Sequence, residues 1–73
     1  MGKIVIGNHI RRLRFEHDEM TQQQLADKVG VTRQTIVAIE KGNYSPSLEL
    51  AFRLALAFGV SLEDVFFIEE TDS

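Results

Sequence analysis

Cysteine is absent from the 73-residue sequence, and so is any long apolar run. Without cysteine, no disulfide can stabilise the fold and no thiolate zinc site can form. The three-residue apolar run near the N-terminus is too short for the core of a signal peptide. No run approaches the roughly 18 apolar residues of a membrane-spanning helix. We therefore expect a cytoplasmic protein.

The sequence also lacks the common motifs of catalytic and cofactor sites. It contains neither a G-x-x-x-x-G-K nor a G-x-G-x-x-G motif, and it has no Cys/His cluster. His9 and His17 lie eight residues apart without a paired ligand pattern, so we interpret them as surface or capping residues. We expect no enzymatic activity, no metal and no cofactor.

Length and composition indicate one small globular domain over residues 1–73, with 44% hydrophobic and 26% charged residues. A chain of this size buries only about 60% of its unfolded surface, so its core alone gives marginal stability. Oligomerisation is the expected source of additional support.

The net charge of −3 is unevenly distributed. Residues 1–53 contain all eight basic and six of the acidic residues, whereas residues 54–73 contain five acidic residues and no basic one. The N-terminal part can therefore present a neutral-to-basic face while the C-terminal part repels anions. The electrostatic signal for nucleic acid is weak, because the pI near 5.2 lies below the value of about 9 that many DNA-binding domains exceed.

Capping residues divide most of the chain into short helices. Thr21 and Gln24 fit the S/T-x-x-E/Q capping box, and Gly30 is suited to end the helix that they begin. The predicted helices, capped by Asn8, Thr21, Thr32, Ser47 and Ser61, cover 9–16, 22–29, 33–41 and 48–58, followed by a very short helix from 62. The apolar segments 3–6 and 66–68 predict two strands that pair as an antiparallel sheet of the chain ends.

Residues 21–42 are the most informative segment, because two capped helices joined by a glycine-containing turn are typical of a helix-turn-helix. At 100° per residue, one arc of the second of these helices carries Arg33, Gln34, Val37, Ala38 and Lys41. Arginine pairs with the edge of guanine, glutamine pairs with the edge of adenine, and small apolar side chains contact the thymine methyl group. The alternative is an ordinary solvent-exposed helix face.

The segments TQQ-LA, GVTRQTI, IEKG-Y-PSLELA and FGVSLEDVF together resemble the Xre, or Cro/C1-type, helix-turn-helix transcriptional regulators. With the first helix, the resemblance covers about 60 residues and is similar to the compact stand-alone members. It implies an all-α, five-helix lambda-repressor-like domain, to which the sheet of the chain ends is added.

The resemblance also implies which residues contact double-stranded DNA. Arg33 and Gln34 occupy base-reading positions, and Gln22 matches a residue that donates to phosphate. The full set is Gln22, Thr32, Arg33, Gln34, Thr35, Val37, Ala38, Lys41, Asn43 and Tyr44. For two of these a structural role competes: Asn43 can adopt a left-handed turn after Gly42, and Tyr44 can pack beneath the loop.

Arg14 and Glu40 match a partly buried ion pair of the family, which we interpret as structural. Two departures limit the resemblance. The connection between Arg14 and Thr21 is one residue longer than the common pattern, so the first helix can end differently. Ala38 stands where some relatives have a polar base-reading residue, which favours a contribution of DNA shape to specificity.

Dimerisation is expected from apolar side chains that a small monomer covers poorly. Leu48, Phe52 and Leu56 form a second stripe on the fourth predicted helix, beside its core stripe. The resemblance and the apolar C-terminal segment make Ser45, Leu62, Val65 and Phe66 the candidates for a homodimer interface. The alternative is that these side chains cover other parts of the same chain.

The sequence therefore predicts a dimeric repressor that binds a pseudo-palindromic DNA operator in the nucleoid, with half-sites about 34 Å apart. No small-molecule ligand is evident. The alternative function is an antitoxin or an adaptor that holds another protein.

Overall fold

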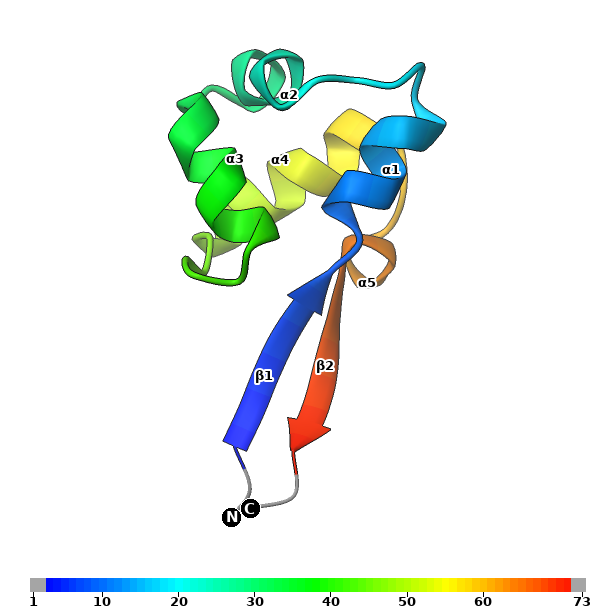
Figure 1. Cartoon of the computed structure of the whole chain (residues 1–73). Helices are drawn as coiled ribbons and strands as arrows, with labels where there is room; N and C mark the ends of the chain where they lie inside the picture. The colour runs from blue at the N-terminus through cyan, green and yellow to red at the C-terminus, as the bar shows by residue number, and fades with distance from the viewer. Residues whose placement is uncertain (1–2, 72–73) are drawn as a thin grey trace.

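The computed structural model describes residues 3–71, which form five short helices and one two-stranded sheet (Figure 1). In chain order the elements are β1 (Lys3–Asn8), α1 (Ile10–Glu16), α2 (Gln22–Val29), α3 (Arg33–Glu40), α4 (Leu48–Phe58), α5 (Leu62–Val65) and β2 (Phe66–Thr71). The predicted five-helix fold with a sheet from the chain ends is confirmed. Among residues 3–71, no helix is both long and apolar enough to cross a lipid bilayer.

The two strands are longer than predicted. β1 and β2 are antiparallel, and the pairing runs from Lys3 opposite Thr71 to Asn8 opposite Phe66. Asn8 therefore belongs to the strand, and His9 takes the N-cap position of α1. The Asn8 side chain still serves the helix start, because its Oδ1 accepts from the Ile10 amide at 3.2 Å while its Nδ2 donates to the Ile39 carbonyl at 2.9 Å. This residue joins the start of α1 to the end of α3.

Side-chain caps set the starts of α2, α3 and α4 where the sequence indicated. The Thr21 hydroxyl accepts from the Gln24 amide at 3.0 Å, and the Gln24 side chain accepts from the Thr21 amide at 2.8 Å. Thr32 caps α3 through the Thr35 amide, and Ser47 caps α4 through the Leu50 amide. These bonds satisfy amides that have no partner within the helix.

The core lies where the five helices meet. Each helix contributes at least one fully buried aliphatic side chain to it, including Ile10, Leu25, Ile36, Leu54 and Val65. Leu13, Ala26, Val29, Ile39, Leu50, Ala55 and Phe58 complete the cluster. α1 follows β1 and α5 precedes β2, and both helices pack on this cluster. The two strands therefore leave the helical body side by side (Figure 1).

The connection from α1 to α2 contains two left-handed positions, Asp18 at φ 57° and Glu19 at φ 53°. Before them, the His17 ring lies between two backbone carbonyls: Nδ1 is 2.8 Å from the Leu13 oxygen and Nε2 is 2.9 Å from the Phe58 oxygen. A neutral ring donates to one of these oxygens, and a doubly protonated ring donates to both. His17 thus links the ends of α1 and α4, as a capping residue does.

Candidate nucleic-acid interface

The turn between α2 and α3 is short because Gly30 ends α2 in the left-handed conformation, at φ 79°. The amides of Gly30 and Val31 both donate to the Ala26 carbonyl, at 2.9 and 3.0 Å. Val31 then packs against the core, and Thr32 caps α3 immediately. The turn therefore brings α3 across α2 within three residues.

This packing gives α3 one buried and one exposed side. Ile36 and Ile39 are buried in the core. Arg33 and Gln34 are exposed at the first turn of the helix, and Thr35, Val37 and Ala38 are partly exposed. The side that the sequence singled out is thus the side that a partner can reach.

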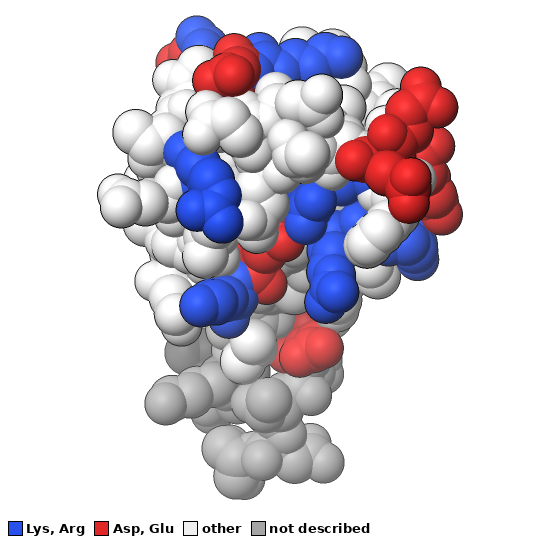
Figure 2. Space-filling view, turned by 45° about the horizontal axis from the view of Figure 1, so that its top comes forward, with Lys and Arg blue, Asp and Glu red and all other residues white. Residues whose placement is uncertain are grey.

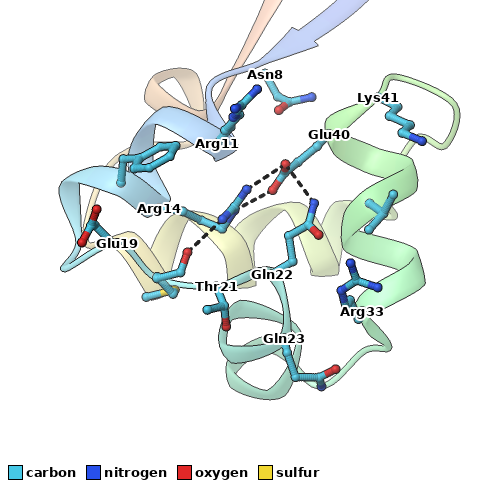
Figure 3. Close-up of a pocket in the computed structure, with 13 residues that line it drawn as sticks. Asn8, Arg11, Arg14, Glu19, Thr21, Gln22, Gln23, Arg33, Glu40 and Lys41 are labelled. Carbon is cyan, nitrogen blue, oxygen red and sulfur yellow. Dashed lines mark hydrogen bonds and ion pairs between the residues drawn. The ribbon is translucent and has the colours of Figure 1, made fainter.

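The exposed side of α3 forms a ridge between two hollows. The first hollow, of about 750 Å³, is open and lies between α1, the start of α2 and α3 (Figure 3). The second, of about 380 Å³, lies on the other side of α3, next to the loop that follows it. Every predicted DNA-contacting residue lines one of the two: Gln22, Arg33, Val37 and Lys41 line the first, and Thr32, Gln34, Thr35, Ala38, Asn43 and Tyr44 line the second.

An ion pair between α1 and α3 forms the floor of the first hollow. Arg14 Nε donates to Glu40 Oε2 at 2.7 Å, and Arg14 Nη2 donates to Glu40 Oε1 at 3.1 Å. The two side chains are 12% and 10% exposed. Arg14 Nη1 also donates to the Met20 carbonyl at 2.8 Å (Figure 3). This geometry fixes α1, the α1–α2 connection and the end of α3 relative to one another.

Gln22 contacts this floor from the start of α2. Its Nε2 lies 3.3 Å from Glu40 Oε1, so the side chain points into the hollow (Figure 3). One of its two amide hydrogens is used by Glu40, and the other remains for a second acceptor. The Gln22 amide is therefore oriented before any ligand arrives.

The side chains around the first hollow carry more positive than negative charge. Arg11, Arg14, Arg33 and Lys41 are cationic, whereas Glu19 and Glu40 are anionic, and Glu40 is neutralised by Arg14. Figure 2 shows basic side chains spread over this side of the molecule, with the largest group of acidic ones at one edge and smaller acidic groups elsewhere. An anion is therefore attracted to this surface although the whole chain is acidic.

Sequence reasoning missed Arg11, which lines the first hollow with its guanidinium 5.9 Å from the centre of the Phe15 ring. Its spacing to Arg14 contained the signal, because residues three apart on a helix share a face. Arg14 forms the ion pair with Glu40, and Arg11 lies about one turn earlier on the same face of α1.

The loop after α3 bears on the structural roles considered for Asn43 and Tyr44. Gly42, at φ 79°, is the left-handed residue, and Asn43 is not left-handed. The alternative role of Asn43 was therefore wrong; its amide donates to the Ala38 carbonyl at 2.9 Å and its side chain is exposed. Tyr44 is 50% exposed, so half of its side chain is open to solvent and half is covered.

The predicted interface residues have different surroundings. Ser45 is exposed, and Leu62 and Phe66 are partly exposed. Val65 is 0% exposed and belongs to the core, so its side chain is not on the surface where the sequence analysis placed it. The α4 stripe of Leu48, Phe52 and Leu56 is exposed.

Comparison with known proteins places this geometry in context. A family model described as Helix-turn-helix matches residues 10–65. An uncharacterised HTH-type transcriptional regulator of Methanocaldococcus jannaschii is 52% identical over 65 residues, which are 89% of this chain and 97% of the relative. The similarly described YgzD of Bacillus subtilis is 49% identical over 63 residues, 86% of this chain and 94% of that protein.

A solved Bacteroides fragilis structure superposes with a TM-score of 0.74 at 22% identity, covering 85% of this chain and 98% of that one, and supports the fold. Two more distant relatives differ in their described roles. The Vibrio cholerae cryptic phage CTXphi transcriptional repressor RstR is 37% identical over 93% of this chain and 60% of the repressor. Antitoxin PezA of Streptococcus pneumoniae is 38% identical over 84% of this chain but 38% of the antitoxin.

Proposed function

The chain belongs to the Cro/C1-type helix-turn-helix family of transcriptional regulators, and from this premise we propose that it binds a DNA operator sequence-specifically as a homodimeric repressor. The observation that carries the proposal is the α3 ridge with its two flanking hollows, around which all ten predicted contact residues lie. A ridge of this shape suits the major groove of B-DNA, which admits one α-helix.

In this mode the two hollows receive the two phosphate backbones that border the groove. Gln22 and Lys41 donate to phosphates at the first hollow, and the basic rim attracts that strand. At the second hollow, Thr32 and Asn43 donate to the other strand. These contacts set the position of α3 without reading sequence.

Sequence is read from the ridge itself. Arg33 and Gln34 are exposed at the start of α3, where they reach furthest into a groove. Arg33 donates to the O6 and N7 atoms of guanine, and Gln34 pairs with adenine. Val37 and Ala38 contribute apolar contacts with thymine methyl groups.

The proposed repression results from occupation of the operator by the protein. A homodimer on a promoter blocks access for polymerase, and its two α3 helices lie about one DNA turn apart. The similarity to a transcriptional repressor over 93% of this chain supports this role. The proposed role is binding rather than catalysis, and it belongs to the cytoplasm, at the nucleoid.

The test is selection of bound sequences from a random duplex pool, followed by titration of the selected duplex at two salt concentrations. We expect a two-fold symmetric motif with half-sites about 34 Å apart. The salt dependence then counts the phosphate contacts. Weak binding without an enriched motif would contradict the proposal.

An antitoxin role is the second candidate, and the similarity to antitoxin PezA together with the exposed α4 stripe favours it. In that case, the stripe of Leu48, Phe52 and Leu56 holds a toxin. Co-expression with the product of an adjacent reading frame tests this role. A 1:1 complex that Leu56→Glu abolishes would support it, and failure to form any complex would remove it.

A further inference from the structure

The two chain ends form a ribbon that projects away from the helical body (Figure 1). β1 and β2 pair only with each other, over six residues each. Residues directly opposite in an antiparallel pair lie on the same face, and neighbours along a strand alternate. The register therefore defines two faces of the ribbon.

One face carries three isoleucines, Ile4, Ile6 and Ile68, and we call it the isoleucine face; Glu70 stands opposite Ile4 at its outer end. Ile6 lies directly opposite Ile68, and Ile4 is two residues along the same strand. Their exposed fractions are 66%, 47% and 61% for Ile4, Ile6 and Ile68. Three β-branched side chains thus remain in water together, although a single β-ribbon is at best marginally stable in water.

The opposite face is covered by the chain itself only at its base. The Phe67 ring lies over Gly7, and it stacks on the His9 ring with 4.5 Å between centres. The same face carries Val5 opposite Glu69. Each face thus has one acidic position towards its outer end, Glu69 on this face and Glu70 opposite Ile4 on the other. The faces differ at the base, where the Phe67 ring shields this one, whereas Ile6 and Ile68 on the other remain exposed.

At its base, the isoleucine face continues into the residues predicted for the dimer interface. Ile6 and Ile68 line one shallow hollow with Leu62 and Phe66. Ile6 and Phe66 also line a smaller one with Ser45. Three of the four predicted interface residues are therefore contiguous with the ribbon.

We propose that the isoleucine face packs against the same face of a second copy of this chain, with Leu62 and Phe66 at the edge of the contact. This inference rests on the homodimer of the proposed function and assigns its interface to the ribbon. A two-fold contact needs only one self-complementary patch, and an apolar face is complementary to itself. DNA is a poor occupant, because this face offers no donor for phosphate.

The assignment is compatible with DNA binding. The ribbon meets α3 near Ile39 and Gly42, at the end of that helix, whereas Arg33 and Gln34 are at its start. Pairing through the ribbon therefore leaves the proposed base-reading residues uncovered.

Sedimentation equilibrium of the full chain without DNA tests the proposal, with Ile6→Glu compared against Val5→Glu. The two residues are neighbours in β1, are both β-branched and are 47% and 41% exposed, but they lie on opposite faces. Burying an unpaired carboxylate is costly, so we expect Ile6→Glu to weaken the dimer on the order of a hundredfold. Val5→Glu places a second carboxylate opposite Glu69, so its ribbon must first be shown intact by circular dichroism. In the folded variant, the dissociation constant is expected to be unchanged.

A second pair of variants keeps the strand intact. Ile6→Thr with Ile68→Thr retains β-branching while removing apolar surface, and Val5→Thr is its control. Circular dichroism confirms folding of each variant. The proposal is overturned by a monomeric wild type, by equal effects of the two faces, or by a dimer that only Leu56→Glu on α4 disrupts. Because no DNA is present, each of these results is independent of operator binding.

Discussion

Replacing Arg14 by methionine tests how much stability the floor of the first hollow provides. The Arg14 guanidinium makes two bonds to Glu40 and one to the Met20 carbonyl. Methionine keeps much of the apolar stem and removes the charge. Glu40 then remains 10% exposed with only the Gln22 amide, at 3.3 Å, as a partner.

The expected loss follows from that unpaired carboxylate. Breaking a buried ion pair costs about 3–5 kcal/mol, and the partial exposure and the Gln22 contact favour the lower end, about 3 kcal/mol. Total stability for 73 residues is about 4–11 kcal/mol. The substitution therefore removes a large part of the free energy of unfolding.

Urea unfolding followed by circular dichroism at one fixed protein concentration measures this loss. Fixed concentration is needed because dimerisation adds to apparent stability. The double variant Arg14→Met with Glu40→Leu is the control, and it should recover most of the loss because no charge is left unpaired. A single variant within about 0.5 kcal/mol of wild type, the range of ordinary surface substitutions, would refute the reasoning.

Three further predictions concern the ridge, its rim and the ribbon. Arg33→Ala is expected to weaken operator binding by about 1–3 kcal/mol and to relax one base position, which binding to single-base operator variants measures. Arg11→Ala is expected to weaken binding equally for all sequences and to lower the salt slope by about 1, and a change at a single base position would contradict its role at the rim. Gly7→Ala is expected to destabilise the fold because its new methyl group meets the Phe67 ring. The same change in a Phe67→Ala background should cost less, and equal costs in thermal melts would show that the ring is not the cause.

Helix boundaries were predictable from the sequence because single side chains set them. Thr21, Thr32 and Ser47 each accept a bond from an amide in the first turn of their helix. Gly30 occupies a backbone conformation that other residues rarely adopt. These signals are local, so no tertiary information was needed to find them.

The errors arose where packing between distant segments decides the outcome. Val65 is an apolar residue of the C-terminal segment, as expected of an interface residue. The core encloses it where α5 meets the other helices. Asn8 has the side chain of an N-cap residue, but pairing with Phe66 draws it into β1. In both cases the competing partner lies far away in the chain, where helix periodicity and capping rules carry no information.

The candidate site has some features that the local sequence predicts and others that only the tertiary structure shows. Periodicity identified the exposed side of α3, since Ile36 and Ile39 mark its buried side. It did not reveal the hollows, because each is bounded by segments that are distant in sequence, such as α1 and α3. The spacing of Arg11 to Arg14 places both on one face of α1, but only the fold shows that Arg11 lies on the same rim as Lys41.

The distribution of charge explains how an acidic chain can use one surface for DNA. Glu63 and Asp64 lie on α5 and Glu69 on β2, at the end of the molecule that the ribbon forms, away from α2 (Figure 1). Phosphates are repelled from that end and attracted to the rim of Arg11, Arg33 and Lys41. Non-specific affinity comes almost entirely from phosphate contacts, so a chain with few free cations binds random DNA weakly. In the proposed homodimer, discrimination between operator and random DNA depends on the ridge of α3 and on the geometry that two copies impose on it.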